Sequence, residues 1–248
     1  MKVIALVNHK GGVGKTTSVM NIAAAMALKN KNILAIDTDP QGNLTDCFGV
    51  KSEERTIYHA FNKPETGLPI VKVKKNLDIV PCNLDFAGIE LEISSRIARE
   101  KILKELLESC QDKYDYCIID CPPSLGLITL NVLVASDSVY IPMLAEYLPY
   151  RGIDSIVGII KQVQKHYNNT LKINGVFFTQ YKGNQIMTRE IKKMLVEQIG
   201  DVLMDTEIRV NVELSEAQAG SIDIFEYNEN SKGADDYKRL TAEILKRG

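Results

Sequence analysis

A glycine-rich segment between an apolar run and a helix-forming run constrains the fold of this chain more than any other feature. The run "KVIALV" at 2–7 has the apolar character of a buried strand, and "SVMNIAAAMALKN" at 18–30 favours a helix. Between them stands "NHKGGVGKTT". Residues without a Cβ allow several backbone N–H groups to converge on anionic oxygens. The segment therefore predicts a strand, a phosphate-binding loop and a helix whose positive N-terminus faces phosphate.

Each position of this loop has a predicted task. Gly11, Gly12 and Gly14 supply the tight turns, Lys15 reaches the β- and γ-phosphates of a nucleotide, and the Thr16 hydroxyl ligates Mg²⁺. The nucleotide-binding residues expected here are Lys10, Gly11, Gly12, Val13, Gly14, Lys15, Thr16 and Thr17.

Apolar runs alternate with helical patterns along the rest of the chain. Strands are predicted at 32–37, 77–81, 114–120, 138–143 and 173–178, and helices at 16–28, 84–110, 125–135, 153–166 and 186–199. A final segment spaces Tyr237, Leu240, Thr241, Ile244 and Leu245 on one helical face. This alternation predicts an α/β fold, a doubly wound and mostly parallel sheet with helices on both faces. With no Ser- or Pro-rich linker, residues 1–248 are expected to form a single domain.

Composition excludes several classes of protein. The 30 Lys and Arg residues nearly balance the 32 Asp and Glu, for a net charge of -2, so the chain is no polycation that coats nucleic acid. Five cysteines without a CxxC pair argue against a disulfide framework or a metal cluster and favour a reducing cytoplasm. No run approaches the roughly 20 apolar residues of a membrane-spanning helix.

The loop departs from the standard phosphate-binding pattern at its beginning. The pattern G-x-x-x-x-G-K-[ST] requires glycine at position 9, where this chain has His9 followed by Lys10. "KGGVGKTT" resembles the deviant Walker A motif of the ParA/MinD family of P-loop ATPases. The resemblance implies that two protomers close face to face over two ATP molecules and that Lys10 reaches the partner's phosphates, as an arginine finger does elsewhere.

Two other stretches resemble motifs of the same family. In "LAIDTDPQGNLT" at 34–45, Asp39 matches the residue that orients the attacking water. In "YDYCIIDCPPSLGLITLN" at 114–131, a Walker B segment, Asp120 would hold the Mg²⁺ shell through water. The resemblance thus implies Lys10, Lys15 and Asp39 as catalytic residues and Thr16, Asp39 and Asp120 as the magnesium set.

The region 206–240 also resembles the family, so the resemblance spans nearly the whole chain and is nearest to the short ParA (Soj-type) DNA-partitioning proteins. It implies a weak ATPase whose ATP-bound homodimer binds nucleoid DNA non-specifically, and a ParB-like, centromere-bound partner that stimulates hydrolysis. Loops after the last strands should bind the base, through Thr179, Thr206, Arg209 and Asn211.

Two positions depart from the family pattern where DNA is expected to bind. Basic residues of the family are replaced by Asn184 and Glu213, and a carboxylate facing phosphates opposes binding. Nearby basic residues could compensate; they are Lys182, Arg189, Lys192, Lys193, Arg209, Lys238, Arg239, Lys246 and Arg247.

Three alternatives follow from these departures and from neighbouring branches of the family. A MinD-like membrane-associated positioning ATPase would use the last helix as an amphipathic anchor. An ATP-switched dimer could act on a protein cargo without DNA. A nitrogenase-iron-protein-like electron carrier would need cluster cysteines, for which Cys117 and Cys121 are the candidates. The absence of bulky aromatic residues in "RLTAEILKRG" favours a partner other than a membrane.

Overall fold

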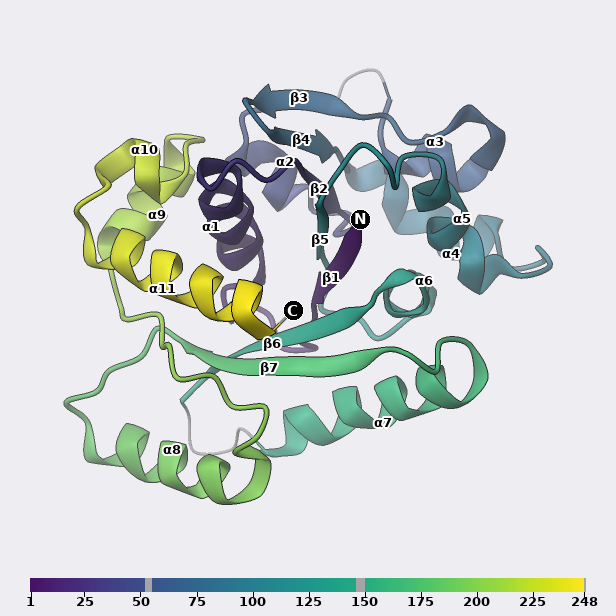
Figure 1. Ribbon diagram of the computed structural model, residues 1–248. Helices are drawn as coiled ribbons and strands as arrows, with labels where there is room; N and C mark the ends of the chain where they lie inside the picture. Colours follow the sequence, from purple (N-terminus) through teal and green to yellow (C-terminus); the bar gives the residue numbers. More distant parts are fainter. Residues whose placement is uncertain (52–54, 146–149, 248) are drawn as a thin grey trace.

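The computed structural model describes residues 1–51, 55–145 and 150–247, without the side chains of 150–153. Its centre is a seven-stranded sheet in the order β3-β4-β2-β5-β1-β6-β7, parallel except for β3 (Figure 1). The strands are β1 Lys2–Leu6, β2 Ile33–Asp37, β3 Val71–Lys74, β4 Leu77–Val80, β5 Tyr116–Asp120, β6 Ser138–Leu144 and β7 Lys172–Thr179. The predicted doubly wound, mostly parallel sheet is confirmed.

Helices cover both faces of this sheet (Figure 1). One face is packed by α1 Lys15–Leu28, α2 Asn43–Cys47, α9 Val212–Ala219, α10 Ile224–Asn228 and α11 Lys232–Arg247. The other is packed by α3 Ile57–Asn62, α4 Ile89–Glu92, α5 Ile102–Glu108, α6 Leu127–Ala135, α7 Tyr150–His166 and α8 Ile186–Ile199. Among the described residues, no helix combines the length and apolar character needed to cross a bilayer.

The continuously apolar strands arise because both faces of the sheet are buried. In β1, Val3 and Ala5 belong to the core on one face, whereas Ile4 and Leu6 belong to the core on the other. Successive side chains of a strand point to opposite faces, so a strand covered on both sides is apolar along most of its length.

The carboxyl ends of three central strands meet at one edge of the sheet. β5 lies between β1 and β2, and its last residue, Asp120, is in register with Leu6 on one side and with Asp37 on the other. The loops that follow β1, β2 and β5 therefore leave the sheet side by side. Open α/β sheets bind ligands in the crevice outside such strand ends.

Two details differ from the sequence prediction. The expected helix over 84–110 is broken into two 3₁₀ turns, Leu84–Gly88 and Arg99–Lys101, and the short helices α4 and α5. Ala98, which has a left-handed backbone (φ 57°), interrupts the helical path immediately before the second turn. The strand β3 was not predicted, since its sequence "VKVK" is short and half polar. It lies antiparallel at the sheet edge, where lysines discourage pairing with another chain.

Candidate functional site

The segment between β1 and α1 forms a tight loop whose conformation depends on two glycines. Gly12 (φ 72°) and Gly14 (φ 77°) have left-handed backbones, and Gly14 stands immediately before the first residue of α1. A side chain would be strained at either position. Only glycine lets the chain turn from the buried strand into a helix within so few residues, so the predicted strand, loop and helix are confirmed.

Side chains from three other positions hold this loop in place. The Asn8 carboxamide oxygen accepts the Lys10 N–H at 3.0 Å. The Thr179 hydroxyl, at the end of β7, lies 2.8 Å from the Val13 carbonyl oxygen, and Gln180 Nε2 donates to the Gly12 carbonyl at 3.1 Å. The Val13 side chain itself is buried. Thr179, which the sequence predicts to contact the base, anchors the phosphate-binding loop in the structure.

The two lysines of the loop have different environments. Lys15 is 8% exposed, and its Nζ lies 3.4 Å from the Lys10 carbonyl oxygen. Lys10 is exposed. One lysine is therefore enclosed with the loop backbone, and the other is exposed.

Asp120 and Thr16 meet beneath the loop, as predicted for a magnesium site. The Thr16 hydroxyl donates to Asp120 Oδ2 at 2.6 Å, and Asp120 is 1% exposed. The second carboxylate oxygen, Oδ1, is buried without a hydrogen-bond partner among the described residues. Burial, and next the neighbouring Asp37, raise the pKa of Asp120 well above its ordinary value, whereas the Thr16 hydroxyl and the Lys15 charge lower it. An unpaired carboxylate oxygen beside a hydroxyl fits an oxygen-ligated cation such as Mg²⁺.

Asp37 is fully buried and organises the loop that follows β2. Its Oδ2 accepts the Thr45 N–H at 2.9 Å and the Thr45 hydroxyl at 2.8 Å, and its Oδ1 accepts the Asp39 N–H at 3.1 Å. Burial raises its pKa to about 6, although the hydrogen bonds from Thr45 lower it. The sequence showed Asp37 at a strand end but assigned it no task. In the structure it fixes both the position of Asp39 and the start of α2.

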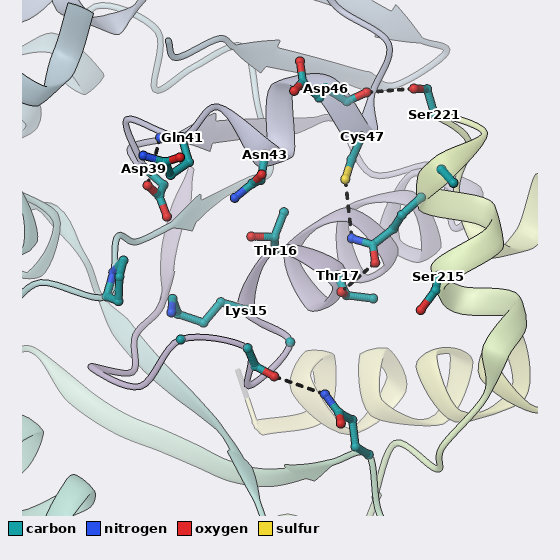
Figure 2. Close-up of a pocket in the computed structure, with 17 residues that line it drawn as sticks. Lys15, Thr16, Thr17, Asp39, Gln41, Asn43, Asp46, Cys47, Ser215 and Ser221 are labelled. Atoms are coloured by element: carbon teal, nitrogen blue, oxygen red, sulfur yellow. Dashed lines mark hydrogen bonds between the residues drawn. The ribbon is translucent and has the colours of Figure 1, made fainter. Parts of the chain in front are cut away.

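An open cleft of about 810 Å³ lies above these residues (Figure 2). Lys15, Thr16 and Asp39 face it from one side, and α9 faces it from the other. Asp39 is half-buried, and its Oδ1 accepts the Gln41 N–H at 3.0 Å. Further lining residues come from the short helices α2 and α9 and their ends, which were not predicted; they include Asn43, Asp46, Cys47, Ser215, Gln218 and Ser221.

A smaller cleft of about 290 Å³ adjoins the first and contains three of the residues expected to bind the base, Thr179, Arg209 and Asn211. The Asn211 carboxamide caps α9 by accepting the Glu213 N–H at 2.9 Å. Thr206 does not line either cleft; its N–H donates to Glu243 at 3.1 Å, on α11.

Arg209 is held by a buried carboxylate. Its Nε and Nη2 donate to Asp236, at 3.0 Å and 2.7 Å, and its N–H donates to the same carboxylate at 2.9 Å. Asp236 is 0% exposed, and its hydrogen bond is the main reason that the pKa of Arg209 is raised. The guanidinium therefore stabilises the cleft wall, and its charge is already compensated.

Two alternatives lose their structural basis. Cys117 and Cys121 are completely buried in an apolar core, where they cannot hold an exposed cluster. Among the described residues, no three or more His, Cys, Asp or Glu side chains are grouped so that they could hold a metal ion by themselves. The apolar face of α11 packs into the core through Leu240 and Ile244 and is not available to a bilayer.

Comparisons with known proteins agree with this geometry. The family described as "AAA domain" matches residues 1–173. The sporulation initiation inhibitor protein Soj of Bacillus subtilis (strain 168) is 39% identical, over 100% of this chain and 99% of the relative. The chromosome-partitioning ATPase Soj of Treponema pallidum (strain Nichols) is 37% identical, over 99% and 98%.

A solved structure has the same fold. Cobyrinic acid a,c-diamide synthase from Mycobacterium smegmatis, with a bound ATP analogue and magnesium, superposes with a TM-score of 0.85 at 30% identity, over 99% of this chain and 95% of that one. Together with the deviant loop around Lys10 and the Thr16–Asp120 pair, these similarities lead to one conclusion: the chain belongs to the ParA/MinD family of P-loop ATPases, whose nucleotide is ATP and whose metal ion is Mg²⁺.

Proposed function

We propose that this chain is a ParA-type partition ATPase, in which ATP drives formation of a face-to-face homodimer that binds DNA without sequence preference. A ParB-like partner then stimulates hydrolysis and release. The observation that carries the proposal is the exposed Lys10 beside the enclosed Lys15. The name of one relative matched over 98% of its length, the chromosome-partitioning ATPase Soj of Treponema pallidum, supports it.

Within one protomer, the loop backbone and Lys15 bind the triphosphate. The Thr16 hydroxyl and, through water, Asp120 would hold Mg²⁺, which neutralises charge on the β- and γ-phosphates when it is bound. Thr16 already donates to Asp120, so the pair is oriented before any ligand arrives. Preorganised groups of this kind lose little freedom on binding.

We assign to Asp39 the orientation of the attacking water. Its N–H is tied to Asp37 and its Oδ1 accepts the Gln41 N–H, which leaves Oδ2 for a water in the cleft. Lys10 of one protomer would reach the γ-phosphate held by the other and neutralise the charge that develops during transfer. Hydrolysis then depends on dimerisation, and ATP selects the dimeric, DNA-binding state.

The surface for DNA is assigned to exposed basic residues near α8, with Lys182 and Arg189 as its first members. Binding to chromosomal DNA would place the protein at the nucleoid within the cytoplasm. Because the contacts are to phosphates, binding should weaken steeply as salt rises.

A second candidate, an ATP-switched dimer that acts on a protein cargo, is favoured by the state of the other basic residues. Several are already in ion pairs with carboxylates: Lys192 with Glu207, Lys193 with Glu190, Arg209 and Arg239 with Asp235 and Asp236, and Arg247 with Glu243. Glu213 is itself fixed by Asn228, at 2.6 Å.

The deciding experiment measures duplex DNA binding by the Asp39→Ala variant, with ATP and with ADP, across a salt series. We expect DNA binding with ATP and none with ADP, and the binding should weaken as salt rises. A second variant that carries both Asp39→Ala and Glu213→Arg should bind DNA more tightly. The Lys15→Ala variant is the matched control that should not bind nucleotide. ATP-dependent dimers that ignore DNA at every salt concentration would overturn DNA binding and favour the protein-cargo candidate.

A further inference from the structure

The two clefts share part of their walls. The residues common to both are Gly14, Thr17, Gln180, Ser215 and Gln218. In a nucleotide, the sugar is the group that joins the phosphates to the base. If the phosphates lie in the larger cleft and the base in the smaller one, as the proposed function requires, these shared residues surround the sugar.

Two of the shared residues come from one face of α9. Ser215 and Gln218 are three residues apart, so their side chains lie on the same side of the helix. Ser215 is exposed, and Figure 2 shows it on the wall opposite Lys15. A hydroxyl and a carboxamide thus stand next to one another where two vicinal hydroxyls of a ribose would lie.

The hydrogen bonds of Gln218 make this carboxamide suited to a sugar. Its Oε1 accepts the Thr17 hydroxyl at 3.1 Å, which fixes the side chain beside the first turn of α1. Its Nε2 donates to Cys47 Sγ at 3.4 Å. A thiol sulfur is a weak acceptor, so exchanging it for a hydroxyl oxygen of the sugar strengthens the bond and leaves no strong acceptor unpaired.

The other two polar side chains of the shared wall, Thr17 and Gln180, are committed to hydrogen bonds within the protein. The Thr17 hydroxyl donates to Gln218 Oε1. Gln180 has a left-handed backbone (φ 49°), and its Nε2 donates to the Gly12 carbonyl. Breaking that bond would release the phosphate-binding loop. The sugar-facing donors therefore come from α9.

We propose that Ser215 and Gln218 bind the ribose hydroxyls and make the protein selective for ribonucleotides over deoxyribonucleotides. This inference rests on the proposed function and extends it, because it adds recognition of the sugar to that of the phosphates. A site that hydrogen-bonds a substrate hydroxyl rejects the analogue that lacks it.

The test compares the dissociation constants of ADP, 2′-deoxy-ADP and 3′-deoxy-ADP by calorimetry in the presence of Mg²⁺. Diphosphates are used because they are not hydrolysed. The wild-type protein should bind ADP about tenfold more tightly than at least one deoxy analogue, the effect of one hydrogen bond of ordinary strength. In the Gln218→Leu or the Ser215→Ala variant, ADP should bind no more tightly than that deoxy analogue. The affinity of the analogue itself should be the same as in the wild-type protein.

The three nucleotides separate a lost contact from a damaged fold. A structural defect in Gln218→Leu would weaken all three equally, and that result, or unchanged discrimination, would overturn the inference. Gln198→Leu, the same change at an exposed position of α8, is the matched control and should behave as wild type. If the wild-type protein bound none of the three nucleotides, the proposed function would fail. If it bound all three equally, sugar recognition would be refuted and the proposed function would stand.

Discussion

At the scale of single residues, the site contains one enclosed and one more accessible member of each charge type. Lys15 and Asp120 are enclosed, whereas Lys10 is exposed and Asp39 is half-buried at the cleft. In the proposed function, the enclosed residues act on a ligand within one protomer. The exposed lysine can act on a second copy, and this difference leads to distinct expectations for the two lysines.

Replacement of the two lysines should have different effects. Lys15→Ala should abolish ATP binding, because the triphosphate loses its enclosed cation. Lys10→Ala should keep binding of ATP to the monomer but lose ATP-dependent dimers, and its hydrolysis rate should fall by about 10²-fold or more. Calorimetry, light scattering and phosphate release measure the three properties. Full dimerisation by Lys10→Ala would remove this residue from the interface.

The buried Asp37 should make stability depend on pH. Its pKa in the folded protein is about 6, above its ordinary value of 3.8, so the folded state holds this proton more tightly. The stability that it contributes is complete below about pH 4 and is lost as the pH rises to about 6, by at most about 3 kcal/mol. Urea unfolding without Mg²⁺ should show the free-energy difference between wild type and Asp37→Asn falling over this range. A difference that is constant with pH would contradict the prediction.

At the scale of elements, short segments complete the site and long ones hold it. The helices α2 and α9 have five and eight residues, and each depends on a contact with another part of the chain. Asp37 holds the start of α2, and Gln218 ties α9 to Thr17. By contrast, α11 has a continuous apolar face that packs beside α1.

The role of α11 can be tested by truncating one buried side chain. Leu240 is 0% exposed, so Leu240→Ala should lower the free energy of unfolding by about 2–5 kcal/mol. Leu91→Ala, at an 82% exposed leucine, is the control and should change it by less than about 0.5 kcal/mol. If Leu240→Ala instead left stability unchanged and reduced binding to anionic vesicles, α11 would be a membrane anchor.

At the scale of the whole molecule, one sheet edge brings three loops together. The order β2-β5-β1 places the loops after residues 37, 120 and 6 beside one another. A ligand bound there connects segments that are distant in sequence. It should therefore stabilise the entire molecule and not a single element.

Nucleotide and magnesium should raise the melting temperature together. At about 100 times its dissociation constant, ADP with Mg²⁺ should add about 2.7 kcal/mol, or roughly 5–10 °C in a chain of this size. Chelation of Mg²⁺ should remove part of this increase. Thr16→Ala should lose the magnesium-dependent part alone, and an undiminished response to Mg²⁺ in that variant would place the metal elsewhere.

The local segments of this protein are predictable from its sequence. Apolar runs, loop glycines and the Lys10–Lys15 pair are properties of neighbouring residues, so they predict β1, the phosphate-binding loop and α1 without knowledge of distant contacts. The alternation of strands and helices likewise predicted the sheet, and the family motifs predicted Asp120 beside Thr16.

The rest of the site depends on contacts between segments that are distant in sequence. The bonds of Asp37 to Thr45 and of Gln218 to Thr17, and the enclosure of Arg209 by Asp236, each join different parts of the fold. Short helices such as α2 and α9 cannot be stable alone, because too few hydrogen bonds offset the entropy of ordering them. They form where packing and buried carboxylates hold them, and no local pattern records those partners.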